Sequence, residues 1–185
     1  TYMRGLDWSP LIISLKTGVV ATAFSFFLGI LAARKVMKAG PKTKAIADGI
    51  LTLPMVLPPT VAGFFLLLIF SLRRPFGSYL YQNMGIKVVQ TWLGCIFAAT
   101  IIAFPLMYRN ARAAFEQVDP NLIYAARTLG MSEICIFWKV VIPAAGPGIL
   151  SGTILTFARA LGEYGATSML AGNIPGKTST ISQKI

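Results

Sequence analysis

Residues 119–143 read DPNLIYAARTLGMSEICIFWKVVIP and lie between two long apolar runs. Asp119 is a favourable N-cap and Pro120 suits the first helical position, so a helix is expected from there to Leu129. Gly130 fits the left-handed conformation that closes many helices. The stretch therefore predicts two short helices joined by a glycine.

The second short helix is expected to begin after Ser132, whose hydroxyl can cap it, and to be broken at Pro143. Ala125 and Ala126 leave part of the first helix without bulk, so the surface of another protein could approach it closely. This pattern favours a solvent-facing docking loop. An ordinary helical hairpin between two membrane spans is the alternative.

The composition of the whole chain indicates an integral membrane protein. Its 185 residues are 55% hydrophobic and 12% charged, whereas soluble domains carry about 25% charged residues. The net charge of +11 comes from basic residues beside the apolar runs. That distribution is typical of loops facing cytoplasm and anionic lipid, so we expect a membrane partner and no nucleic acid.

The residues of ordinary catalytic and metal sites are scarce. The chain has no histidine, which removes the commonest metal ligand and the commonest general base. Cys95 and Cys135 lie in different segments and define neither a disulfide framework nor a metal site. Ser14 and Lys16 are two apart and share no helical face, and no glycine-rich phosphate loop is present. An enzyme is therefore not expected, and no metal or catalytic residue is assigned.

Four membrane spans are expected from length and hydropathy: residues 11–37, 50–72, 88–108 and a fourth from about residue 146. The helix of the third span is expected to continue toward Phe115. Residues 73–87 are interpreted as a short external loop. The alternation calls for a fifth span beyond Ile185, and both ends of the chain look trimmed.

A basic loop follows the first span and sets the expected topology. It holds Arg34, Lys35, Lys38, Lys42 and Lys44, so the positive-inside rule makes it cytoplasmic and the N-terminus external. Three basic residues in 73–87 weaken this topology signal.

The second span is expected to be kinked or broken because it contains Pro54, Pro58 and Pro59. Broken backbone at membrane depth is tolerated only against protein or a water-filled cavity. A segment lining a transport pathway is the functional interpretation. A kinked packing helix is the alternative.

Small residues in the fourth span should allow close helix contacts: Gly148, Ser151, Gly152, Gly162 and Gly165. Arg159 and Glu163 are four apart and can pair on one helical face. An ionisable pair inside a span indicates either a pathway or a self-neutralised structural pair.

The loop at 119–143 resembles the cytoplasmic loop of ABC importer permeases. That family carries Glu-Ala-Ala, three residues, Gly, nine residues and Ile-x-Leu-Pro. The matching positions here are Ala125, Ala126, Gly130, Val140, Ile142 and Pro143, while Tyr124 replaces the usual Glu. In the family this helix docks on an ATP-hydrolysing subunit. The resemblance therefore implies a coupling set of Tyr124, Ala125, Ala126, Arg127, Leu129, Gly130 and Met131.

Longer segments resemble the molybdate branch of these permeases. They are DWSPLIISLKTG, LPMVLPPTVAGFFLLL, FPLMYRNARAAFEQVD, AARTLGMS and TFARALGEYGATSMLAGNIPGKT. Sulfate or thiosulfate permeases are the nearest alternative, because they share the Phe-Ala-Arg-Ala-x-Gly-Glu core. Two features favour the molybdate branch. Sulfate permeases more often have Ser-Val where this chain has Ala166 and Thr167, and the run at 173–178 also looks more like the molybdate branch. No residue separates molybdate from tungstate.

The resemblance implies an all-α, polytopic helix bundle of the type I ABC importer kind, in the cell membrane of a prokaryote. Residues 1–185 would form a single transmembrane domain with its coupling loop at 119–143. Two copies would form one pathway, with two ATPase subunits that hold ATP and Mg and an extracytoplasmic binding protein. No cofactor is expected on this chain. A non-transporting membrane scaffold would explain the spans but not the loop.

An oxyanion in a low-dielectric pathway needs hydrogen-bond donors. From residue type and depth, the expected donors are Thr52, Thr60, Thr153 and Thr156, beside helix ends freed by Pro54, Pro58 and Pro59. Arg159 and Glu163 complete the set of pathway candidates.

Overall fold

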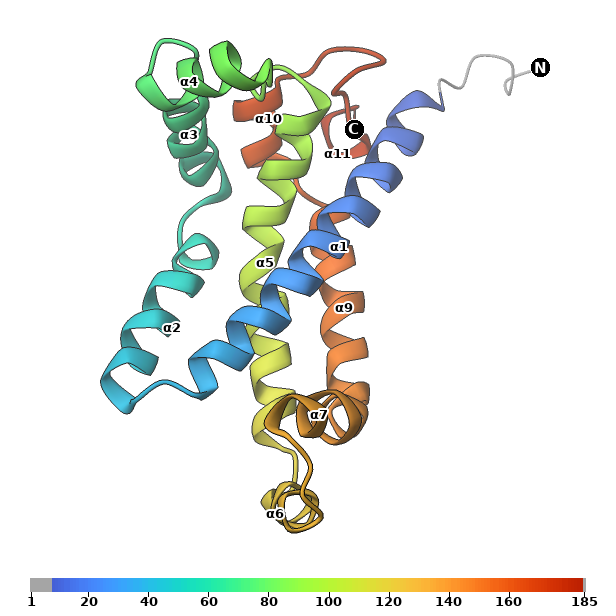
Figure 1. Cartoon of the computed structure of the whole chain (residues 1–185). Coiled ribbons are helices and arrows are strands. Elements are labelled where there is room, and N and C mark those ends of the chain that lie inside the picture. Colours follow the sequence, from blue (N-terminus) through green and yellow to red (C-terminus); the bar gives the residue numbers. More distant parts are fainter. Residues whose placement is uncertain (1–7, 185) are drawn as a thin grey trace, which may run out of the picture.

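A computed structural model describes residues 8–184, and every regular element in that range is helical (Figure 1). The elements are α1 (Ser9–Met37), α2 (Pro41–Val56), α3 (Pro59–Phe70), α4 (Pro75–Met84), α5 (Trp92–Glu116), α6 (Pro120–Thr128), α7 (Glu133–Ile136), the π-helical turn η2 (Phe137–Val141), α8 (Ile142–Ala144), α9 (Gly146–Leu161), α10 (Gly165–Ala171) and α11 (Ile181–Lys184).

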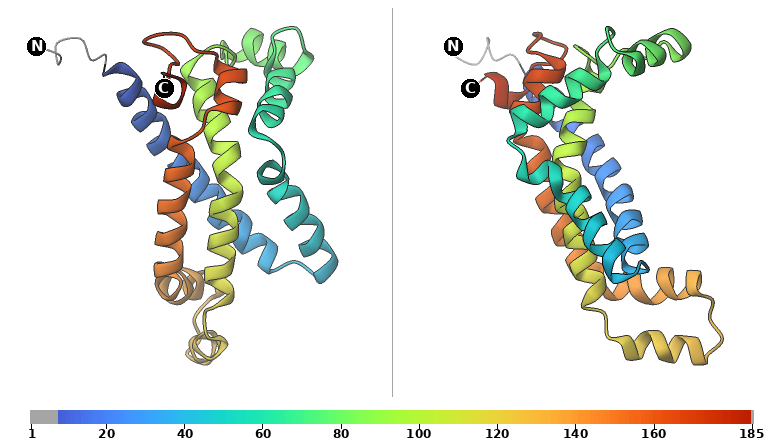
Figure 2. Two further views of the ribbon diagram at one scale, coloured as in Figure 1. Left: turned by 180° about the vertical axis from the view of Figure 1, so that it is seen from behind. Right: turned by 90° about the vertical axis from the view of Figure 1, so that its left-hand side faces the viewer.

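The long helices α1, α5 and α9 form the centre of the bundle. α5 packs on both of the others, and α1 crosses it obliquely (Figures 1 and 2). α6 lies at one end of the bundle and α4 at the opposite end. We call these the α6 end and the α4 end.

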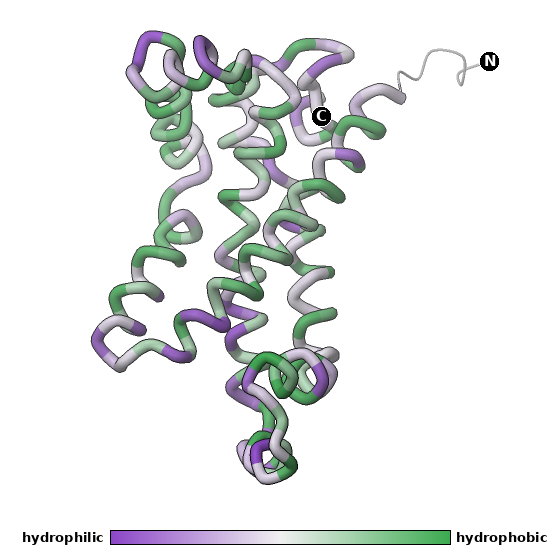
Figure 3. The backbone as a smooth tube through the Cα atoms, in the orientation of Figure 1, coloured by the Kyte–Doolittle hydropathy of each residue, from purple (hydrophilic) through white to green (hydrophobic). Residues whose placement is uncertain are grey.

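Two helices, α1 and α5, are each long and apolar enough to cross a membrane. Two further spans are possible if bent pairs are counted: α2 with α3, bent by 106°, and residues 133–144 with α9, bent by 71°. Hydrophobic residues dominate the middle of the bundle, and hydrophilic residues gather toward its two ends (Figure 3). The expected all-helical fold is confirmed.

Small residues let the central helices approach closely. A Cβ added to Gly152 would lie 2.6 Å from Asn110 Cβ, and one added to Gly148 would lie 2.6 Å from Ala114 Cβ. Both contacts join α9 to α5, as the small-residue pattern predicted. Ser151 is exposed, and at Gly162 the only atom within 4 Å of an added Cβ is the Ala158 carbonyl oxygen of the preceding helical turn.

The second span differs from its expected limits. It begins at Pro41 instead of residue 50, runs through Pro54 without interruption and breaks between Val56 and Pro59. Leu57 and Pro58 have extended ψ angles of 141° and 135°. The break lies there because a residue that precedes proline is pushed out of the helical region, and both residues precede one.

The expected external loop at 73–87 is largely the helix α4. Pro75 supplies the first-turn proline, and Gly85, with φ of +66°, closes the helix. These are ordinary start and stop signals, which the loop interpretation overlooked.

The fourth span is also interrupted. α9 ends at Leu161, and α10 begins at Gly165 after a short turn. The backbone N–H of Ala166 donates to Glu163 Oε1 at 2.8 Å, so the Glu163 side chain satisfies a free N–H at the start of α10.

From the sequence, the helix was expected to break at Pro143. This expectation was wrong, because Pro143 lies inside α8. The irregularity lies on either side of it. Before Pro143 the chain forms the π turn η2, in which Ile142 N–H donates to the Phe137 carbonyl. After it the helix bends at Ala145. Pro143 has no N–H to donate, so the local hydrogen-bond ladder changes without ending the helix.

Candidate functional site: a docking helix and a broken membrane span

α6 lies outermost at its end of the bundle, with the segment from α7 to α8 between it and the long helices (Figure 2). Its start is capped as expected, since Asn121 N–H donates to the Asp119 carboxylate at 2.9 Å. Gly130 has φ of +74°, which confirms the left-handed joint. Ser132 Oγ then accepts from Cys135 N–H at 3.3 Å and caps α7.

α6 and its C-cap residue expose apolar side chains among polar ones. We call Leu122, Tyr124, Ala125 and Leu129 the docking face, and Leu129 is 80% exposed. Ala126 differs from these residues. It is only 4% exposed and packs in the core of its own chain, so of the two alanines only Ala125 offers close approach to another protein.

The joint between α6 and α7 is held by charged and aromatic contacts. Arg127 Nε donates to Glu133 Oε1 at 2.7 Å, and the Arg127 guanidinium lies 5.9 Å from the centre of the Tyr124 ring. The hydrogen bond from Arg127 lowers the pKa of Glu133 from its usual value. The pair therefore stays ionised at neutral pH, and Tyr124 finds a partner within its own loop.

The loop is tied to the bundle through Phe137. The guanidinium of Arg34, near the end of α1, lies 4.1 Å from the centre of the Phe137 ring. Phe115 of α5 meets the same ring edge to face, with 5.6 Å between ring centres. Packed side chains therefore connect the loop to both α1 and α5.

The pathway threonines do not form one cluster. The hydroxyls of Thr52, Thr153 and Thr156 each donate to the backbone carbonyl four residues earlier, at 2.6, 2.8 and 2.7 Å. Thr156 is fully buried, whereas Thr60 is exposed beside the break between α2 and α3. Of the four, Thr60 is thus the best placed to meet a solute.

Arg159 and Glu163 pair as expected, with Arg159 Nη1 2.8 Å from Glu163 Oε2. The Glu163 side chain is 1% exposed and that of Arg159 is 36% exposed. Because Glu163 also caps α10, both of its oxygens already have partners. This geometry favours the structural interpretation of the pair.

A polar cluster between α2 and α5 was missed at the sequence level. It contains Lys44, Asp48, Tyr108, Arg112 and Glu116, and it borders a cavity of about 430 Å³ that Thr52 also lines. The four-residue spacing of Arg112 and Glu116 is a signal for pairing within α5. No local pattern connects Asp48 to Tyr108, sixty positions later.

Among residues 8–184, no group of three or more His, Cys, Asp or Glu side chains is placed to hold a metal ion.

Known proteins resemble the chain over almost its full length. It is 43% identical over 175 residues to the molybdenum transport system permease protein ModB of Escherichia coli strain K12, covering 95% of this chain and 76% of that relative. It is 35% identical over 173 residues to the sulfate transport system permease protein CysT of Salmonella typhimurium, covering 94% of this chain and 62% of that relative.

Among solved structures, the inward-facing MetNI methionine ABC transporter matches with a TM-score of 0.69 at 19% identity, over 88% of this chain and 74% of that chain. This likeness concerns the fold alone, and it agrees with the helical permease architecture expected above. Residues 25–184 also match the family described as binding-protein-dependent transport system inner membrane component. The chain is therefore a multi-pass membrane protein that belongs to this family of transport-system inner membrane components.

Proposed function

We propose that this chain is the membrane-spanning permease subunit of an ATP-driven importer that brings molybdate, or the chemically similar tungstate, into the cell. The observation that carries the substrate assignment is the 43% identity to a molybdenum permease across 95% of the chain. The lower identity to the sulfate permease, 35% over a similar length, makes sulfate or thiosulfate the second candidate.

The proposed driving force comes from separate ATPase subunits, since the chain carries no phosphate-binding loop of its own. In this proposal the docking face of α6 fits a groove of an ATPase subunit, which holds ATP and Mg. Two copies of the chain form one pathway, and an extracytoplasmic binding protein delivers the oxyanion. The exposed apolar residues of the docking face support such a contact, because large exposed apolar patches mark interaction surfaces.

The α6 end faces the cytoplasm in the proposed topology, and the N-terminus lies outside. The basic residues that support this orientation are Arg34, Lys35, Lys38, Lys42, Lys44 and Arg109. They follow the spans at or near the α6 end, as the positive-inside rule expects of a cytoplasmic side.

The proposed pathway runs along the two interrupted spans. α3 and α10 pack closely, since a Cβ on Gly63 would lie 2.6 Å from Ala166 Cα. Irregular backbone at membrane depth is tolerated where it meets protein or water, and both interruptions adjoin this contact. Thr60 is the proposed pathway residue nearest to the first interruption, and Thr52 lines the polar cavity beside α2. Arg159 and Glu163 pair beside the second interruption and are assigned a structural role there.

The test is uptake of labelled molybdate by cells that express this chain with its ATPase and binding protein, with excess sulfate as competitor. We expect ATP-dependent uptake that survives sulfate and is lost when the ATPase site is inactivated. Uptake abolished by sulfate would assign the chain to sulfate transport. A complex that takes up neither ion would refute the proposed function.

A further inference from the structure

α2 is attached to the rest of the bundle in an unusual way. None of its sixteen residues is buried, although the central helices are fastened by many buried side chains. Ala47 and Leu51 pack only against the edge of the core. Figure 1 shows α2 standing to one side of α1 and α5. Apolar packing alone therefore holds this half-span weakly.

The firm contacts of α2 are polar and go to α5. Asp48 Oδ1 accepts from the Tyr108 hydroxyl and pairs with Arg112 Nη1. Glu116 Oε1 accepts from Arg112 Nε at 3.0 Å and from Lys44 Nζ at 2.8 Å. The cluster thus joins two positions on α2, one helical turn apart, to three positions on α5.

The charged side chains of the cluster are only partly buried. Its two carboxylates face two cations and a hydroxyl, so it is electrically balanced. Its charged side chains are 20–44% exposed. Ion pairs with such exposure are individually weak and can exchange with water. Burial would have made the same pairs costly to separate.

The surroundings leave room for movement. A polar cavity of about 430 Å³ lies beside the cluster, and an apolar cavity of about 400 Å³ lies between α2, α1 and α5. At its far end α2 meets the proline break at Leu57 and Pro58, where the chain bends by 106°. Pro58 and Pro59 have fixed φ angles and no N–H, so no helical hydrogen-bond ladder crosses the break, and a change of direction there would come from the ψ angles of Leu57 and Pro58.

We propose that α2 moves against α5 during the transport cycle, with its hinge at Leu57 and Pro58, and that Lys44, Asp48, Arg112 and Glu116 form a latch that positions it. Tyr108 orients Asp48 within the latch. This inference rests on the proposed transport function but names a moving part within it. A permanent brace between two static helices is the competing explanation.

The first experiment cross-links α2 to α5 in the full complex with its ATPase subunits, in proteoliposomes. Cys95 and Cys135 are first replaced by Ala, and the pair Lys44→Cys with Glu116→Cys is then bridged by a reducible bifunctional thiol reagent. Because the latch must open, we expect cross-linking to lower uptake roughly tenfold, equivalent to a coupling change typical of allosteric transitions. A reducing agent should restore the uptake that the same variant shows before cross-linking, which is the baseline because Lys44 and Glu116 belong to the latch.

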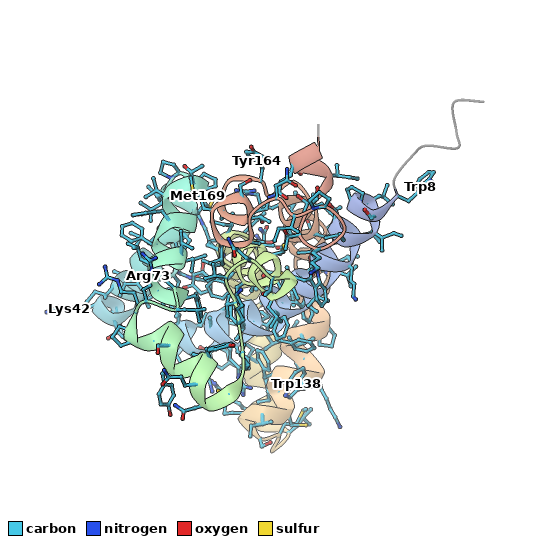
Figure 4. All side chains as sticks on the ribbon, turned by 90° about the horizontal axis from the view of Figure 1, so that it is seen from above. Trp8, Lys42, Arg73, Trp138, Tyr164 and Met169 are labelled. Carbon is cyan, nitrogen blue, oxygen red and sulfur yellow. The ribbon has the colours of Figure 1, made fainter. Side chains whose placement is uncertain are left out.

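The matched control is Lys42→Cys with Glu116→Cys, because Lys42 lies two residues earlier and points away from the bundle (Figure 4). The same reagent should not lower the uptake of this variant below its own untreated value. Full uptake by the cross-linked Lys44→Cys pair would overturn the latch and favour the static brace.

Spin labels at positions 44 and 116 make the test independent of the substrate. Their separation should increase, or its distribution broaden, between the nucleotide-free complex and the complex trapped with ATP and vanadate. An unchanged distribution would overturn the latch even if molybdate uptake is observed. A nucleotide-dependent change, together with no molybdate uptake by the unsubstituted complex, would keep the latch and refute the substrate assignment.

Charge variants provide a readout that does not depend on introduced cysteines. Asp48→Asn keeps the shape of the side chain but removes the charge that Arg112 contacts. We expect transport per ATP hydrolysed to fall about fivefold in an assembled complex, within the usual range of coupling effects. Asp48→Glu should recover most of the coupling. Equal transport per ATP in all three proteins would contradict the positioning role.

Discussion

Gly130 illustrates how much of the docking loop depends on single residues. Its φ of +74° lets the chain turn sharply between α6 and α7, and no atom lies within 4 Å of a Cβ built there. Any cost of substitution at this position therefore comes from the backbone and not from crowding. Side chains stabilise the two helices on either side of that turn. Asp119 caps α6, Ser132 caps α7, and the Arg127–Glu133 ion pair links the two.

Gly130→Val should impair coupling more than assembly. A β-branched residue resists positive φ, and left-handed backbone costs about 1–2 kcal/mol in L-residues. We expect lower uptake per ATP hydrolysed, measured in proteoliposomes, with normal amounts of complex. The control is Gly40→Val, because Gly40 has φ of −66° and open space around it. Normal coupling in Gly130→Val would show that the rigid joint does not transmit motion.

Thr60 is expected to matter more than Thr156 for passage of the oxyanion. Thr60→Val removes an exposed hydroxyl beside the break, whereas the hydroxyl of the buried Thr156 already donates to the Gly152 carbonyl. Loss of a hydrogen bond to a charged group costs about 1.5–3 kcal/mol, so uptake by Thr60→Val should fall at least several-fold. The measurement is the initial rate of labelled molybdate uptake by each variant and by the unsubstituted protein. A Thr60→Val rate equal to that of the unsubstituted protein would remove Thr60 from the pathway.

At the scale of elements, two interrupted spans meet each other. α3 and α10 are the halves that follow the breaks, and they pack through Gly63, Ala166 and Gly165. A Cβ on Gly165 would lie 3.1 Å from Pro59 Cβ. Because the neighbours of Gly63 include backbone atoms of α10, this contact cannot adjust by a side-chain rotation.

Gly63→Ala should therefore destabilise the contact between α3 and α10. The added Cβ would lie 2.6 Å from Ala166 Cα, and overpacking of this kind costs about 1–3 kcal/mol. The thermal midpoint of the purified protein in detergent should fall. Gly49→Ala is the matched control, since nothing lies within 4 Å of its Cβ and alanine favours a helix interior. A midpoint unchanged by Gly63→Ala would mean that the two half-spans do not pack as described.

At the scale of the whole molecule, the docking face lies at the α6 end, whereas the breaks between α2 and α3 and between α9 and α10 lie nearer the α4 end (Figures 1 and 2). The connection runs from α6 through Phe137 to Arg34 of α1 and Phe115 of α5. α5 in turn carries the three latch positions that hold α2. One continuous helix thus contacts both the docking loop and the half-span proposed to move.

Leu129→Asp should weaken binding of the ATPase subunit. Leu129 is 80% exposed, so the substitution leaves the fold of the chain intact but places a charge in an apolar contact. Truncation or charging of an interface anchor costs about 2 kcal/mol or more, and copurification of the ATPase should drop accordingly. The control is Ile134→Asp, an exposed apolar residue of α7 outside the docking face. Normal copurification with Leu129→Asp would exclude this face as the docking surface.

The helical membrane fold and the docking loop could be predicted because their causes are local. Apolar runs of sufficient length, the Asp119 and Ser132 caps and Gly130 act within a few residues of themselves. The small residues Gly148 and Gly152 likewise indicated close packing before a partner helix was known. Three predictions were wrong because local signals were weighed incorrectly. They concern the start of α2, the loop expected where α4 lies, and the helix break expected at Pro143.

Other features depend on residues that the fold brings together from distant parts of the chain. Whether Ala126 faces outward or inward depends on the core that α5 and η2 build beneath it. The latch joins Asp48 to Tyr108 and Lys44 to Glu116 across separations of 60 and 72 residues. Capping, helix length and hydropathy are short-range effects and were determined by the sequence itself. The pairing of charges between helices was decided only by the tertiary structure, because it requires two helix faces to meet.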